Sequence, residues 1–295
     1  VPPVKVFRKG ELQDDIIKIV LRNSRMPHWN EGDFKGVIAA CNIADRRCIE
    51  MAERFGDDVF YSALDELLER NCRAMQKLIM ETVPEEVQTF EDYICDDALG
   101  SGPYKIKCSM WREGEKVIFD FDGTDPQSPG SINFLLNEEM FKMFCGTFMI
   151  SAFDPQILFN DGFYDYMDVR IPEGSLLKPT RPAALSCRTH ALGRIFDVLG
   201  GLLGQGNPDF LCGAGFSDSP HFMYSGYDKN GEWYQLYQIG FGGIPARPIG
   251  DGPDGHSLWP GFKNVPNEFL EAYFPLRTET YESITDSGGA GYDGG

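Results

Sequence analysis

The chain has 295 residues, with 45 Asp and Glu against 27 Lys and Arg and a net charge of −18. A field of that sign repels phosphate backbones, and no basic stripe offsets it, so we expect no nucleic-acid partner. No apolar run approaches the ~20 residues that cross a bilayer, so no membrane segment is expected. The eight cysteines form no C-x-x-C pair and no zinc-ribbon spacing, a usage typical of the reducing cytoplasm.

The sequence pattern predicts a helical segment over residues 1–87. Apolar residues recur at helical spacing over 33–55, and Gly56 is the predicted C-cap of this helix. Asp57 opens a second long helix that Pro84 ends, so we expect an antiparallel helical hairpin. The apolar stripe of the second helix comprises Phe60, Leu64, Leu67, Leu68, Met75, Leu78 and Ile79.

Residues 88–295 form a second segment, in which the apolar period changes to two. The stretches 104–111 and 116–121 alternate on either side of a turn at Gly114, which predicts a β-hairpin. A short strand is expected over 233–238, where aromatic residues alternate. The segment therefore mixes strands with helices.

Two helices are expected within this second segment. One covers 190–204, and the other, over 138–152, is predicted to be buried through Met140, Phe141, Met143, Phe144 and Phe148. The fold class is therefore α+β: a helical N-terminal hairpin followed by a mostly antiparallel β-sheet with inserted helices. Because the chain begins without Met and ends in loop-like sequence, we expect an internal part of a longer polypeptide.

The segment 120–124 matches D-x-D-G-T, the nucleophile motif of haloacid-dehalogenase-type phosphatases. In that chemistry Asp120 would attack phosphorus and Asp122 would serve as acid and base. The motif normally opens its domain after a buried parallel strand, whereas here it follows a hairpin, and the expected βα alternation is missing. The same residues also fit a strand that runs into an Asx-type turn.

Three glycine-dense loops near the C-terminal end hold most of the candidate functional residues. They cover 250–256, 264–268 and 286–291, and loops of this kind usually carry chemistry on a rigid scaffold. Each loop alone also fits ordinary turn chemistry, since Gly supplies positive φ and Asp or Asn caps a turn. Their common order is what favours a functional interpretation.

Three residues of these loops are the catalytic candidates. His256 comes first, because His titrates near neutral pH and can act as acid, base or ligand. Asp251 can orient His256 or raise its pKa as a neighbouring carboxylate. Glu268 is the third candidate, and a Glu in the first turn of a helix also interacts with the helix dipole.

The substrate-binding candidates come from the same loops. Asn264 can bind a carbonyl or a carboxylate, and Asp254 lies close to His256 in sequence. The run Asp286-Ser287-Gly288-Gly289 can offer backbone N–H groups to a phosphate or carboxylate as a nest. It lacks the Gly-Lys-Ser or Gly-Lys-Thr element of a Walker loop.

An ordered set of motifs resembles the hydantoinase B/oxoprolinase family over nearly the whole chain. The resemblance rests on the ordered set of motifs rather than on any single motif. Together with the three loops, the stretches that resemble family landmarks are Asn23-Ser24-Arg25-Met26-Pro27, Asp120-Phe121-Asp122-Gly123-Thr124-Asp125-Pro126-Gln127, Gly130-Ser131-Ile132-Asn133 and Pro172-Glu173-Gly174-Ser175-Leu176-Leu177.

The resemblance implies a B-type subunit of a hetero-oligomer with an A-type, ATPase-like partner. In the family the partner uses ATP with Mg to phosphorylate the carbonyl or enol oxygen of a small substrate. The B-type subunit then completes hydrolysis or carboxylation. The resemblance also implies a divalent metal, Zn or Mn, held by Asp and His motifs upstream of the equivalent of Val1.

Cytoplasmic, ATP-dependent hydrolysis of a cyclic amide or hydantoin is the preferred hypothesis. The first alternative is a subunit of an ATP-dependent acetone or acetophenone carboxylase. A non-catalytic scaffold subunit and a haloacid-dehalogenase-type phosphatase are the further alternatives.

Overall fold

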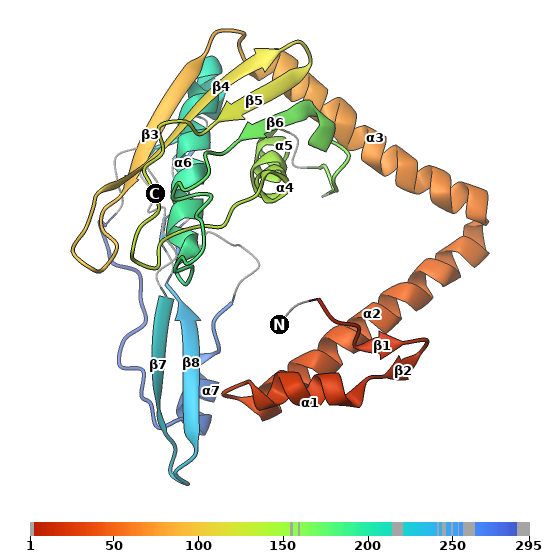
Figure 1. The fold of residues 1–295 in the computed structure, drawn as a ribbon, viewed down its shortest axis with the longest axis vertical. Coiled ribbons are helices and arrows are strands. Elements are labelled where there is room, and N and C mark those ends of the chain that lie inside the picture. Colours follow the sequence, from red (N-terminus) through yellow and green to blue (C-terminus); the bar gives the residue numbers. More distant parts are fainter. Residues whose placement is uncertain are drawn as a thin grey trace. The chain divides into compact units, whose positions relative to one another are not determined.

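Figure 1 shows the computed structural model, which divides into two compact units, 1–65 and 66–295. It describes residues 3–153, 156–158, 160–213, 221–240, 242–243, 246–248, 250–252, 254–255 and 263–287. Within these residues no helix has the length and apolar character needed to cross a membrane. Helices combine with antiparallel and mixed sheets, so the predicted α+β class is confirmed.

The first unit is helical and has no core of its own. It comprises β1 (Phe7–Arg8), β2 (Glu11–Leu12), α1 (Asp14–Arg22), α2 (Pro27–Phe55) and the start of α3 (Asp57–Thr82). The predicted C-cap is confirmed, since Gly56 ends α2 at φ 87° and its N–H donates to Ala52 O at 2.8 Å. None of the unit's described residues is buried.

Only the second half of the α3 stripe is buried. Met75, Leu78 and Ile79 are fully enclosed in the second unit, whereas Leu64 and Leu68 are exposed. Helical spacing identifies the apolar face of a helix. It does not show where along the helix the core begins.

The second unit is built on a four-stranded sheet. Its order is β3 (Gln88–Ile94), β4 (Tyr104–Glu113), β5 (Lys116–Asp120) and β6 (Met167–Arg170). The pairs β3–β4 and β4–β5 are antiparallel, and β5–β6 is parallel. The predicted hairpin is confirmed, with Glu113 opposite Lys116 and Gly114 in the turn at φ 63°.

The D-x-D-G-T segment is a turn at the end of β5. Asp120 Oδ1 accepts a hydrogen bond from Asp122 N at 2.9 Å, and Thr124 N donates to Phe121 O at 3.1 Å. The sheet around it is mostly antiparallel rather than doubly wound. The interpretation as a strand running into a turn is confirmed, and the motif lacks the setting of a phosphatase.

Helices cover the sheet and close the core. They are α4 (Glu138–Phe141), the π-helix η1 (Lys142–Gly146), α5 (Thr147–Phe153), the 3-10 helix η2 (Tyr164–Tyr166), α6 (Arg188–Gly206) and the 3-10 helix η3 (Pro208–Phe210). The helix predicted over 138–152 is present, and Phe141 is fully buried. The predicted burial of Met143 and Phe148 is wrong, since they are 44% and 37% exposed. The π-helical turn η1 departs from the regular 3.6-residue spacing and shifts the buried face.

The helix α6 lies along β3 and β4, as Figure 1 shows. The helix expected over 190–204 is thereby confirmed, and its buried side includes Ile195, Leu199 and Leu202. A Cβ at Gly201 would lie 2.7 Å from the ring of Phe90 on β3. Glycine is therefore required where the helix approaches the strand.

Asp97 joins several loops at one end of the sheet. Its carboxylate accepts hydrogen bonds from Leu99 N at 2.9 Å, Ser101 N at 3.1 Å, Tyr104 Oη at 2.9 Å and Ser128 Oγ at 2.9 Å. Burial opposes ionisation of Asp97, but these hydrogen bonds outweigh it and lower its pKa to about 2. The carboxylate is thus held as an anion with its oxygens satisfied.

Asn133 extends the same network, and its side chain is fully buried. Its Oδ1 accepts from Ser128 N at 2.8 Å, and its Nδ2 donates to Ser128 O at 2.8 Å, Gly130 O at 3.0 Å and Ala184 O at 3.0 Å. A Cβ at Gly130 would lie 2.5 Å from Asp97 O. The landmark stretch 130–133 is therefore part of the architecture.

A two-stranded ribbon and a short helix complete the described chain. The antiparallel strands are β7 (His221–Tyr227) and β8 (Trp233–Ile239), so the strand expected over 233–238 is confirmed. Helix α7 (Asn267–Tyr273) lies beside β8 in Figure 1. The rings of Tyr234 and Phe274 are 5.2 Å apart, which packs the end of α7 against the ribbon.

We expect Asp97→Asn to lower stability at neutral pH, because an amide cannot accept all four hydrogen bonds. The folded-state pKa of about 2 lies below the unfolded value, so the stabilisation is complete above about pH 4 and lost as pH falls towards 2. The free energies of unfolding of wild type and variant, measured in urea, should therefore approach each other as pH falls from about 6 to about 2.5. The control is Asp96→Asn, whose exposed carboxylate accepts from Ala98 N. The same pH dependence in both variants would contradict the assignment.

Candidate functional site

The loop that carries most of the predicted catalytic residues is tied at both ends to β8. It leaves the strand after Ile239 and returns at Asn264. Asn264 Oδ1 accepts from Ile239 N at 2.9 Å, and its Nδ2 donates to Ile239 O at 2.8 Å. These two bonds imitate the pairing of a neighbouring strand. The amide of Asn264, predicted to bind substrate, is thus engaged in closing the loop.

The described part of this loop presents two of the predicted acids to solvent. Arg247 N donates to Gly250 O at 2.9 Å, and Gly250 N donates to Arg247 O at 3.1 Å, which forms a tight turn. Asp251 and Asp254 follow this turn, and both are exposed. His256, the leading candidate, lies outside the described residues.

Glu268 lies in the first turn of α7, as the alternative explanation through the helix dipole predicted, and it is exposed. The helix is held by Leu270, which is buried. In the part of the chain that the structure describes, no hydrogen bond joins Glu268 to Asp251, Asp254 or Asp286. A constellation of these residues is therefore a proposal, and not a contact in the described chain.

The last predicted loop is described only at its start. Asp286 has φ 60°, the left-handed conformation that favours a turn, and it is exposed. Ser287 Oγ donates to Ile284 O at 2.8 Å. Gly288 and Gly289 lie outside the described residues, so the predicted nest stays a prediction.

His221 is a hub that the sequence did not single out. Its Nε2 lies 3.0 Å from Thr189 Oγ1 at the start of α6, and its Nδ1 contacts Tyr237 Oη on β8. The His221 and Tyr237 rings stack with centroids 5.1 Å apart. Burial raises the pKa of Tyr237, so its hydroxyl stays protonated near neutral pH. His221 therefore fastens the base of the ribbon to α6.

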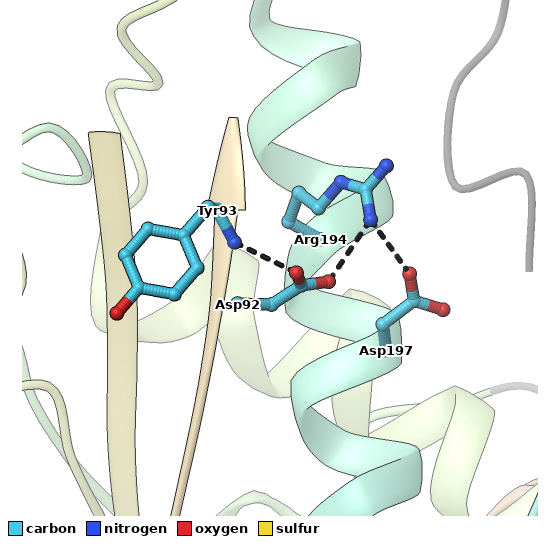
Figure 2. A network of polar contacts seen from close by, with 4 residues as sticks. All are labelled: Asp92, Tyr93, Arg194 and Asp197. Atoms are coloured by element: carbon cyan, nitrogen blue, oxygen red, sulfur yellow. Dashed lines mark hydrogen bonds and ion pairs between the residues drawn. The ribbon is translucent and has the colours of Figure 1, made fainter. Parts of the chain in front are cut away.

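A second polar cluster joins α6 to the sheet (Figure 2). Arg194 Nη1 lies 3.0 Å from Asp92 Oδ2 on β3 and 3.4 Å from Asp197 Oδ2 one turn along α6. The other oxygen of Asp92 accepts from Tyr93 N at 2.7 Å. One guanidinium thus serves two half-buried carboxylates, which leaves one negative charge in excess.

The excess negative charge favours the protonated form of Asp197. Burial raises the pKa of Asp197 to about 7, Arg194 opposes that effect, and Asp92 adds to it. A carboxylic acid that titrates near neutral pH is a common feature of functional sites, and it also occurs in structural ion-pair networks. Here the cluster holds α6 against the edge strand β3.

Within the described residues, no three His, Cys, Asp or Glu side chains are placed to hold a metal ion. The divalent metal that the family resemblance implied was placed upstream of Val1, so it stays a prediction.

Comparison with known proteins identifies the family. The family model for hydantoinase B/oxoprolinase matches residues 1–295. The chain belongs to the hydantoinase B/oxoprolinase family, which confirms the resemblance seen in its motifs. It is 26% identical to the beta subunit of the caprolactamase from Pseudomonas jessenii, over 99% of this chain and 51% of the relative. It is also 26% identical to the B subunit of a putative D-/L-hydantoinase from Pseudomonas sp. (strain NS671), over 95% of this chain and 48% of the relative.

Two solved structures share the fold. The crystal structure of the ATP-dependent caprolactamase from Pseudomonas jessenii matches with a TM-score of 0.86 at 25% identity, over 99% of this chain and 51% of that one. A nucleotide-free structure of acetone carboxylase matches with a TM-score of 0.78 at 17% identity, over 93% of this chain and 39% of that one. The second likeness shows the fold alone. The chain spans about half the length of the curated relatives that it matches.

We expect Asp197→Asn to remove a pH-dependent penalty. Because the folded-state pKa of about 7 lies above the unfolded value, the folded protein favours the protonated acid, and stability is lost as pH rises through about 7. Between about pH 5.5 and 8.5, the free energy of unfolding of the wild type, measured in urea, should fall by on the order of 2 kcal/mol relative to that of the variant. The exposed Asp209→Asn is the control. A constant gap between wild type and Asp197→Asn across this range would refute the shift.

Proposed function

We propose that the chain acts in the B-type subunit of an ATP-dependent complex that hydrolyses a cyclic amide or hydantoin. An A-type partner would bind ATP with Mg and phosphorylate the carbonyl oxygen of the substrate. The observation that carries the proposal is the likeness to the ATP-dependent caprolactamase over 99% of this chain. The relatedness to a hydantoinase B-type subunit supports the same class of substrate.

The chemistry explains why such a reaction needs both activation and proton transfer. Amide resonance makes the carbonyl carbon a poor electrophile, and phosphorylation of the oxygen removes that protection. Water then adds to the carbon and loses a proton to a base. The ring nitrogen must next take up a proton, so that the amine leaves and the ring opens to an acyl phosphate. Water hydrolyses the acyl phosphate to the carboxylate and phosphate.

The C-terminal loops supply groups of the kind that these steps need. We assign His256 as the base that takes the proton from water and as the acid that returns it to the ring nitrogen. Asp251 would orient His256, and Glu268 is the second carboxylate available for proton transfer. Support comes from the exposure of Asp251 and Glu268 and from the Asn264 clamp, which fixes where the loop begins and ends.

The remaining predicted residues would hold the substrate. We assign Asp254 to the amide N–H of the ring and Asp286, Ser287, Gly288 and Gly289 to the phosphorylated oxygen. Backbone N–H groups of a turn suit that oxygen because they present donors without a side-chain charge. Asn264 contributes by positioning the loop, since its amide is bound to Ile239.

The test is turnover of the complex assembled with its A-type subunit. ATP-dependent ring opening is measured with caprolactam, 5-oxoproline and hydantoin, alongside acetone with bicarbonate. His256→Ala is expected to lower ring opening by about 100-fold or more while leaving assembly intact. His28→Ala, an exposed histidine of α2, is the matched control.

Each other outcome points to a different role for the chain. Carboxylation of acetone without ring opening would replace the hydrolase by the ketone carboxylase. Unchanged turnover in His256→Ala would remove the catalytic role of the loop and favour a scaffold subunit. Mg²⁺-dependent phosphatase activity that is lost in Asp120→Asn would revive the phosphatase.

A further inference from the structure

A cavity of about 340 Å³ lies where α3 and α6 end. The last residues of the two helices, Thr82 and Gly206, both line it. The helix ends are in close contact, because a Cβ at Gly206 would lie 2.3 Å from Thr82 O. Pockets that take a small organic molecule have volumes of ~300–1,000 Å³. Two helix C-termini therefore border one space of ligand size.

The end of α3 leaves backbone oxygens without helical partners. Val83 N donates to Ile79 O at 3.0 Å, which continues the helical series by one bond. The next bond, to Met80 O, would need an N–H from residue 84, but Pro84 has none. A Lys or Arg in the last turn of a helix commonly bonds such carbonyls. Neither α3 nor α6 has a basic residue in its last turn.

Thr82 adds a hydroxyl group without a partner. Thr82 is 3% exposed, and among the residues that the structure describes its Oγ1 is the one buried side-chain oxygen or nitrogen with no hydrogen bond. A buried hydroxyl that is left unpaired lowers stability, so a native fold usually supplies its bond, by the protein or by a bound molecule. Met80 O and Thr82 Oγ1 are thus two acceptors at this cavity that a ligand can satisfy.

The charged residues that line the cavity are mostly acids, with Glu81, Glu85 and Glu86 against Arg112. The guanidinium of Arg112 is already engaged, since its Nη2 lies 2.9 Å from Glu85 Oε1. Lys77 Nζ lies 4.0 Å from Glu81 Oε1, but Lys77 does not line the cavity. Glu86 makes no hydrogen bond or ion pair with the described residues. Together with the negative ends of two helix dipoles, these carboxylates favour a cation.

We propose that this cavity binds an aliphatic amine in its ammonium form. An ammonium group has three N–H donors and no acceptor, so it suits Met80 O and Thr82 Oγ1 and offsets the nearby carboxylates. Met80, Val83 and Pro84 line the cavity with apolar atoms that can contact the methylene groups of the amine. A metal ion is a poorer occupant, because no three His, Cys, Asp or Glu side chains among the described residues are placed to hold one. None of these residues belongs to the C-terminal loops, so the site is independent of the proposed function.

Isothermal titration calorimetry of the full chain with 1,5-diaminopentane at about pH 7 tests the site. We expect saturable binding, and about tenfold weaker binding in Thr82→Val, which keeps the shape of the side chain and removes one acceptor. Glu86→Gln should bind about threefold more weakly, because it removes one attracting charge. Glu173→Gln changes an exposed acid that does not line the cavity, and it should bind as wild type does.

Two further ligands separate the contribution of charge from that of shape. The uncharged 1,5-pentanediol has a chain of the same length and should not bind. The zwitterion 6-aminohexanoate carries the ammonium group together with a carboxylate. It should bind at least about fivefold more weakly than the diamine, because Glu81 and Glu86 repel its carboxylate.

Three outcomes would overturn the proposal. The first is no saturable binding of the diamine up to about 10 mM. The second is equal binding by wild type, Thr82→Val and Glu86→Gln, because attraction to the acidic chain as a whole would then explain it. The third is equal binding of the diamine and the diol. Urea unfolding checks the fold of each variant, and Thr82→Val should be at least as stable as wild type, because it removes an unpaired buried hydroxyl.

Discussion

The buried polar network around Asp97 and Asn133 is the constraint on which the rest of the second unit depends. Asp97 takes four hydrogen bonds and Asn133 makes four more, and Ser128 belongs to both sets. Inside a protein, a buried polar group without a partner costs more than a satisfied one contributes. The loops that meet here are therefore fixed in relation to one another, because a shift of any one would leave a charged or amide group unsatisfied.

That network reaches the loop of the proposed catalytic residues through α6. Next to Asn133, Ser131 O accepts from Cys187 N at 2.8 Å and so sets where α6 begins. Thr189, two residues on, holds His221 and thereby the ribbon. The ribbon ends at Ile239, which Asn264 clamps. A continuous series of contacts thus runs from the core to the loop of the proposed catalytic residues, which gives an exposed loop a rigid base.

Local sequence patterns predicted the regular elements well. Gly56 ends α2 and Gly114 forms the turn of the hairpin, and both adopt a positive φ, which glycine tolerates. The apolar spacing of the flanking residues marked both positions in the sequence. The exposure of Met143 could not be predicted, since a π-helical turn leaves no mark in a 3.6-residue pattern. His221 was missed for a different reason: its partners lie 32 and 16 residues away in sequence, and no spacing rule connects them.

The candidate site was likewise predictable from the sequence only in part. Asp251 and Glu268 were predicted as residue types in glycine-dense loops, and their exposure is consistent with that interpretation. Asn264 was predicted to bind substrate, but only the structure shows its amide paired with the backbone of Ile239. An asparagine that closes a loop and one that binds a ligand look alike in sequence, because the difference lies in a contact 25 residues away.

The exposure of the proposed catalytic acids sets a condition on the proposed reaction. Proton transfer and oxyanion stabilisation are strong where water is excluded, and Asp251 and Glu268 face solvent in this chain. The loop that bears Asp251 starts at Ile239, the last residue of the ribbon, and is clamped there by Asn264. The proposed site therefore needs a further surface to exclude water, and the chain alone should be far less active than the complex.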